Sequence, residues 1–116
     1  MRDIEHKIQV GCVRWFRMQY RDIAFCLFAI PNGGARDAVT GRRMKDEGVV
    51  AGVADLFLSV ARKGHHGLYI EMKTDKGKQS VAQVEFQKRV ELQGYRYVVC
   101  RSLDDFIGVV NDYLNS

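Results

Sequence analysis

Apolar residues recur along the chain with two different periods, and each change of period marks a new element. Between residues 3 and 19 they fall every three or four positions, which predicts a helix. This stripe consists of Ile4, Ile8, Cys12, Trp15 and Phe16. Residues 22–30 form an almost continuous apolar run, short enough for a strand that is covered on both faces.

The remaining apolar runs predict three more strands and three more helices. The strands are expected at 53–60, 67–73 and 95–101, and the helices at 36–47, 80–93 and from Ser102 onward. This order predicts an α/β fold, a mixed sheet with helices on its faces. The strand–helix–strand unit from Glu71 to Arg101 should be a parallel, right-handed crossover.

Turn and cap signals separate these elements. Pro31-Asn32-Gly33-Gly34 ends the first apolar run, and residues 62–67 form the turn between the two central strands. Ser80 followed by Gln83 matches a capping box, in which each side chain satisfies a free amide at the helix start. This pattern gives Gln83 a structural role at the helix end.

The strand at 67–73 carries the first candidate chemistry. Residues two apart on a strand share a face, so Glu71 and Lys73 should stand side by side while the alternate residues enter a core. The pattern of an acid, any residue and a lysine is weak alone, because roughly one chance match is expected in such a chain. This chain has two, Glu5-His6-Lys7 and Glu71-Met72-Lys73, and only the second lies on a predicted strand.

Asp55, near the start of the preceding strand, gives Glu71 and Lys73 a possible purpose. Pairing of the two strands as a hairpin would bring Asp55 to Glu71, and two converging carboxylates repel unless a cation joins them. Such oxygen ligands suit Mg²⁺ or Mn²⁺, which could activate a water beside a scissile phosphate. Lys73 would orient that water and stabilise the developing charge. The alternative is an exposed Glu71–Lys73 pair at a solvated sheet edge, of little energetic value.

Composition and net charge bear mainly on the class of molecule that the protein binds and on its location. A chain of 116 residues with 47% hydrophobic and 28% charged residues is typical of one soluble globular domain. Its net charge of +4 suits a nucleic acid, although many basic proteins bind none. The odd number of widely spaced cysteines favours a reduced, cytoplasmic location. Neither a signal peptide nor a membrane-spanning run is expected.

Five basic residues and one asparagine, in three segments, are candidate DNA contacts. Clustered cations suit phosphates, although a solvated surface helix is the more common explanation for the basic stretch at 36–47. The turn at 31–34 could let a phosphate backbone approach closely, or could be a plain turn. The candidates are Asn32, Arg36, Arg42, Arg43, Lys76 and Lys78.

Several segments together match a known pattern. They are 52–58 and 67–73, then Gly77-Lys78-Gln79-Ser80, Gln83, Phe86, Gly94-Tyr95, Arg101-Ser102 and Asp105-Phe106, with Ile30-Pro31-Asn32 upstream. With this spacing the chain resembles the VRR-NUC family, the virus-type replication-repair nucleases of the PD-(D/E)XK superfamily. The resemblance covers nearly the whole chain and is weakest before residue 20. Ala54 departs from the proline of the superfamily name, but proline is not a ligand.

The resemblance implies a nuclease core of the order αβββαβ, here with an extra helix between the first two strands. Residues 1–116 would form a single VRR-NUC domain. It implies that Asp55 and Glu71 bind Mg²⁺ or Mn²⁺ together with the Met72 main-chain carbonyl, and that Lys73 is catalytic.

Two further residues gain a candidate role from the resemblance. Gln83 stands at the family's glutamine and becomes an active-site candidate beside its capping role. Glu5 matches the acidic residue that many superfamily members carry on the first helix, and so becomes a candidate metal ligand. Otherwise it is a solvated carboxylate near the start of the helix.

Short stand-alone members resemble phage and bacterial forms that dimerise and cut branched DNA such as Holliday junctions. We therefore expect a homodimeric, metal-dependent DNA endonuclease in the cytoplasm of a bacterium or a phage-infected host. One alternative is a nuclease specific for flaps, nicks, ends or a sequence. Others are an inactive DNA-binding module and a partner-binding subunit with an incidental basic surface.

Overall fold

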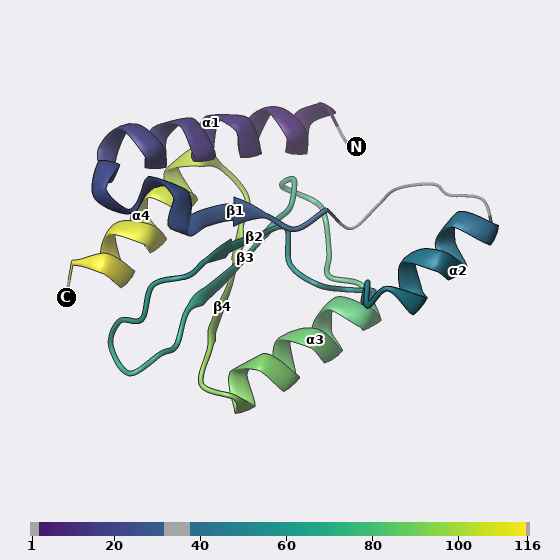
Figure 1. Cartoon of the computed structure of the whole chain (residues 1–116). Coiled ribbons are helices and arrows are strands. Elements are labelled where there is room, and N and C mark those ends of the chain that lie inside the picture. Colours follow the sequence, from purple (N-terminus) through teal and green to yellow (C-terminus); the bar gives the residue numbers. More distant parts are fainter. Residues whose placement is uncertain (1–2, 32–37, 116) are drawn as a thin grey trace.

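The computed structural model describes residues 3–31 and 38–115 and contains one mixed four-stranded sheet between helices (Figure 1). The strand order is β1-β2-β3-β4, with antiparallel pairing except between β3 and β4, which are parallel. The strands are β1 (Leu27–Ala29), β2 (Leu56–Leu58), β3 (Leu68–Met72) and β4 (Arg96–Cys100).

The helices cover the sheet unequally. They are α1 (Asp3–Gln19), α2 (Ala38–Asp46), α3 (Val81–Leu92) and α4 (Leu103–Leu114). Helices α1 and α4 lie on one face and α3 on the other, while α2 extends away from these layers (Figure 1). The expected α/β fold is confirmed, including the extra helix between the first two strands. Within the described residues, no helix combines the length and apolar character that a membrane crossing requires.

The main core lies between the sheet and the α1–α4 layer. Alternate strand residues and the inner stripes of both helices meet there without exposed surface, and each such large apolar side chain stabilises the fold by roughly 1.5–3 kcal/mol. The core includes Leu56, Leu58, Leu68, Ile70, Cys12, Phe16, Phe106 and Val110. The predicted stripe of α1 is thus correct at its centre, but Ile4 at its start is 65% exposed.

The prediction of a strand at 22–30 that is buried on both faces is wrong, both in the length of the strand and in its burial. Arg21–Cys26 form a 3₁₀-helix, because the chain turns back directly after α1, and β1 begins only at Leu27. Phe25 is 83% exposed, with the guanidinium of Arg17 5.2 Å from its ring centroid. Phe28 is 44% exposed because β1 is an edge strand.

The β2–β3 hairpin fixes the geometry on which the site depends. Strand β2 is shorter than the predicted 53–60 and starts directly after Asp55. The register pairs Leu56 with Ile70 and Phe57 with Tyr69. One further step of this antiparallel register sets Asp55 opposite Glu71.

The loop that leads to Asp55 is anchored at Gly52. This residue has a φ of +89°, and a Cβ there would lie 2.4 Å from the main-chain oxygen of Ala82 in the first turn of α3. Only glycine tolerates both the backbone angle and the close approach. At the same helix start, the predicted capping box of Ser80 and Gln83 is formed. The start of α3 and the Asp55 loop are therefore packed together.

Candidate active site

Asp55 is held at the edge of the sheet by the main chain of its neighbours. Its carboxylate Oδ2 accepts a 2.6 Å hydrogen bond from the Met72 N–H, and its carbonyl accepts one of 2.8 Å from Ile30. Burial raises the pKa of Asp55, the Met72 N–H opposes this, and the charges of Glu71 and Glu5 raise it further. Its charged form is thus disfavoured in the protein alone.

Glu71 lies on the central strand β3 and has no exposed surface, which is unusual for a carboxylate. Its Oε1 accepts a 3.0 Å hydrogen bond from Gln79 Nε2 and another from the Tyr97 hydroxyl. Its Oε2 lies 3.4 Å from Lys73 Nζ and has no hydrogen-bond donor among the described residues. The alternative of an exposed pair at a sheet edge is therefore wrong.

The donors at this site fit a hard divalent cation. A buried carboxylate oxygen without a hydrogen-bond partner is rare, and two adjacent carboxylates repel each other unless a cation lies between them. The Met72 N–H points to Asp55, and in a regular strand the carbonyl of the same residue points to the same side. Asp55, Glu71 and the Met72 carbonyl could thus hold an ion such as Mg²⁺, which keeps several waters.

Glu5 lies close enough to influence Asp55 but does not complete a three-carboxylate cluster. Its charge contributes to the raised pKa of Asp55, so α1 brings it into the neighbourhood of the site. Over residues 3–31 and 38–115, however, no three His, Cys, Asp or Glu side chains gather as metal ligands.

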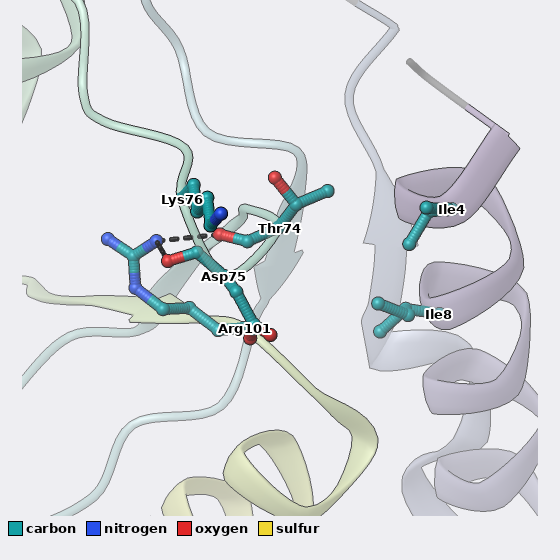
Figure 2. Close-up of a pocket in the computed structure, with 6 residues that line it drawn as sticks. All are labelled: Ile4, Ile8, Thr74, Asp75, Lys76 and Arg101. Carbon is teal, nitrogen blue, oxygen red and sulfur yellow. Dashed lines mark hydrogen bonds between the residues drawn. The ribbon is translucent and has the colours of Figure 1, made fainter.

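The loop that follows Lys73 is fixed from β4. Arg101 donates through Nη1 to the carbonyls of Thr74 at 2.7 Å and of Asp75 at 3.3 Å (Figure 2). It also donates through Nη1 to the carbonyl of Gly77 at 2.7 Å. A Cβ at Gly77 would lie 3.2 Å from Cδ of Lys73, so this loop also packs on the lysine stem. These contacts limit the positions that the Lys73 ammonium can take.

A cleft of about 440 Å³ opens beside this loop. Ile4 and Ile8 of α1 form one wall, and Thr74, Asp75 and Lys76 face them across the opening (Figure 2). The cleft adjoins Lys73 through Thr74. It therefore combines an apolar wall from α1 with polar and cationic groups of the loop after Lys73.

Comparison with known proteins identifies the family. A family model described as "VRR-NUC domain" matches residues 5–104, which is most of the chain. The chain belongs to the VRR-NUC family. A solved structure described as "VRR_NUC domain protein" is similar with a TM-score of 0.83 and 27% identity, covering 95% of this chain and 87% of that chain. No curated protein matches.

Membership of the VRR-NUC family carries a coarse function. The domain is a nuclease of the PD-(D/E)XK type, for which DNA is the implied substrate, and the family generally depends on a divalent metal. The resemblance seen in the sequence is thereby confirmed. The buried carboxylate, its lysine and the neighbouring aspartate occupy the segments from which that resemblance was drawn.

Gln83 and Gln79 have different positions in this VRR-NUC domain. The side chain of Gln83 accepts from the Ser80 N–H at 2.8 Å, so its oxygen is engaged in the helix cap. Gln79 instead contacts Glu71, as does Tyr97. The sequence analysis assigned no role to Gln79 or to Tyr97. Parallel pairing of Tyr97 with Tyr69 would have placed the Tyr97 side chain on the face of Glu71.

The candidate DNA contacts are spread over the exposed surface. Arg42 and Arg43 are exposed on α2, which projects from the layers (Figure 1). Lys76 and Lys78 are exposed in the loop after Lys73. The other two candidates, Asn32 and Arg36, lie outside the described residues.

Proposed function

We propose that this VRR-NUC protein is an endodeoxyribonuclease that uses Mg²⁺ or Mn²⁺ to hydrolyse phosphodiester bonds in branched DNA. The observation that carries the proposal is the arrangement of Asp55, Glu71 and Lys73. One carboxylate oxygen is buried without a donor, the second carboxylate has a raised pKa, and an ammonium lies 3.4 Å from the first. A cation held by these oxygens would give Glu71 Oε2 a partner and would favour the charged form of Asp55, with the ammonium of Lys73 beside it.

Each residue has a defined task in this proposal. Asp55, Glu71 and the Met72 carbonyl would hold the ion, which would supply a water of lowered pKa and neutralise charge on the phosphate. Glu71 Oε2 positions Lys73, whose ammonium donates to an oxygen on which negative charge develops. A water oxygen bonds to phosphorus and loses a proton to solvent, the P–O bond to one nucleoside breaks, and the departing oxygen takes up a proton from solvent, which leaves a phosphate monoester and a free hydroxyl.

The substrate proposal rests on the resemblance to stand-alone members and on the surface around the site. The cleft beside Lys73 would receive the scissile strand, with Lys76 at its phosphates. Arg42 and Arg43 on the projecting α2 would contact a second arm of the DNA. A homodimer would present two such sites, one for each of two strands of a Holliday junction.

A cleavage assay tests this function. Labelled four-way junction, flap, nicked and linear duplex substrates are incubated with the protein in Mg²⁺, Mn²⁺ or EDTA. We expect symmetrical cuts in the junction with either metal and none in EDTA. Cleavage in EDTA would refute the metal-dependent mechanism. Equal cleavage of linear duplex would refute branch selectivity, and binding without cleavage in both metals would identify an inactive DNA-binding module.

The dimer is tested separately by light scattering after gel filtration, with and without junction DNA. We expect the mass of two chains in both samples. A single chain in both samples would contradict paired cleavage by one dimer.

A further inference from the structure

The two oxygens of the Glu71 carboxylate have different surroundings. Oε1 receives two donors from separate parts of the fold, the Tyr97 hydroxyl of β4 and Gln79 Nε2 of the loop before α3. Oε2 receives none among the described residues and lies 3.4 Å from Lys73 Nζ. Because the whole side chain is buried, water does not compensate for this difference. The carboxylate is thus held by one oxygen.

The Gln79 amide is itself held in one orientation. Its Nε2 lies 3.0 Å from Glu71 Oε1 and 2.9 Å from Gln87 Oε1, both of them acceptors. An amide nitrogen has two hydrogens, so both are used, and a flipped amide would set its oxygen against two other oxygens. Gln87 in turn donates to Glu91 Oε2 at 3.1 Å. A chain of hydrogen bonds therefore runs from the exposed side of α3 to the buried Glu71.

Tyr97, on the neighbouring strand β4, holds the same oxygen of Glu71. Its side chain is 5% exposed, and its ring lies 6.3 Å from that of Phe86, centroid to centroid. The hydroxyl has a single hydrogen, and Glu71 Oε1 receives it. Two donors on Oε1 prevent the carboxylate from turning that oxygen toward Lys73.

We propose that Gln79 and Tyr97 are positioning residues of the metal site, which occupy Oε1 of Glu71 and leave Oε2 for a divalent cation. The inference rests on the proposed function, in which Glu71 is a metal ligand. Partners that orient a ligand are commonly worth about 10- to 100-fold in metal affinity. Without these donors the Glu71 carboxylate can turn, and Oε2 no longer has a fixed position for the ion.

Metal binding without DNA tests the inference. Free Mn²⁺ is measured by electron paramagnetic resonance during titration of the full-length protein and of Tyr97→Phe and Gln79→Leu variants. Each variant should weaken Mn²⁺ binding about 10- to 100-fold. Cleavage should recover at high Mn²⁺ concentration, because the catalytic groups remain. Circular dichroism verifies that each variant is folded, and the two variants test the same oxygen independently.

A matched control separates positioning from general damage. Tyr95→Phe removes a hydroxyl from a neighbouring tyrosine and leaves both donors on Glu71 and the Gln79–Gln87 hydrogen bond in place. It should bind Mn²⁺ like the wild type. Unchanged affinity in folded Tyr97→Phe and Gln79→Leu would overturn the inference while the proposed function stands. Equal Mn²⁺ binding by wild type and Glu71→Gln would overturn the proposed metal site, and the inference with it.

Discussion

Glu5-His6-Lys7 and Glu71-Met72-Lys73 have the same pattern of an acid, any residue and a lysine, yet their positions differ completely. The first lies on α1, where residues two apart diverge and where His6 and Lys7 are exposed. The second lies on β3 and its end, where Glu71 is fully buried and its Oε2 is 3.4 Å from Lys73 Nζ. Because β3 places both side chains on one face, Glu71 and Lys73 form an ion pair.

The neighbours of each pattern complete the difference. Glu71 is held by donors from β4 and the loop before α3, and stands opposite Asp55 through the β2–β3 register. The charge of Glu5 raises the pKa of Asp55. The candidate site therefore depends on the strands and the loop around Glu71 and not on the acid–lysine pattern alone.

The two lysines provide the largest expected contrast. Lys73→Ala should lower the rate of DNA cleavage by about 10²- to 10³-fold, the loss typical of one group that stabilises developing charge. DNA binding, measured by gel shift in EDTA, should change little. Lys7→Ala is the matched control and should cleave like the wild type. Full activity of Lys73→Ala would remove this residue from the mechanism.

Two glycines provide the next contrast, Gly52 in the loop before Asp55 and Gly11 on α1. Gly52→Ala should destabilise the protein by more than the roughly 1–2 kcal/mol of a left-handed backbone, because its Cβ also meets the Ala82 oxygen at 2.4 Å. Gly11→Ala on α1 meets nothing within 4 Å and should stabilise by about 0.5–1 kcal/mol. Urea unfolding measures both. A neutral Gly52→Ala would contradict the role of this contact in holding the Asp55 loop.

The parts of the fold that were predictable are those encoded over short distances. The stripe of α1 and the Ser80–Gln83 cap are local patterns, and both elements form as expected. The face shared by Glu71 and Lys73 follows from the period of a strand alone. Asp55 was found because a hairpin gives few possible registers.

The features that sequence reasoning missed depend on tertiary contacts. An apolar run at 22–30 does not reveal that Phe25 and Phe28 face solvent, since this depends on what covers the edge strand. Gln79 lies in an irregular loop without periodicity, so nothing local aims it at Glu71. The Tyr97 hydroxyl reaches Glu71 only through the register of β3 with β4.

Glu5→Gln sharpens the comparison from the side of α1. The substitution removes a negative charge that raises the pKa of Asp55, but leaves a side chain of the same shape. If Glu5 acts only at a distance, Mn²⁺ affinity should change by no more than about 10-fold, the lower bound for direct partners of a ligand. Isothermal titration with Mn²⁺ measures it, with Glu71→Gln as the reference for loss of a ligand. An equal loss in both variants would make Glu5 a ligand that moves on binding.

The smallest effect is expected on the stability of Asp55→Asn without metal, which tests how strongly burial disfavours the charged form of this carboxyl group. The pKa of Asp55 is raised above its ordinary 3.8, chiefly by burial, so the folded protein binds a proton more tightly than the unfolded chain. Without metal, this carboxyl supports the fold below the unfolded pKa, and its support is lost as pH rises through the folded value. Asn keeps an acceptor for the Met72 N–H but does not titrate.

The stability of Asp55→Asn relative to wild type should therefore increase as pH rises through this window and then level off. Urea unfolding in EDTA at a series of pH values from acid to neutral measures this difference. Added Mg²⁺ should stabilise the wild type more than the variant, because the ion binds only the folded carboxylate pair. A difference that stays constant with pH would contradict the raised pKa. An equal response of both proteins to Mg²⁺ would contradict a ligand role for Asp55, and would leave the buried Glu71 as the only carboxylate to which the strand geometry assigns the ion.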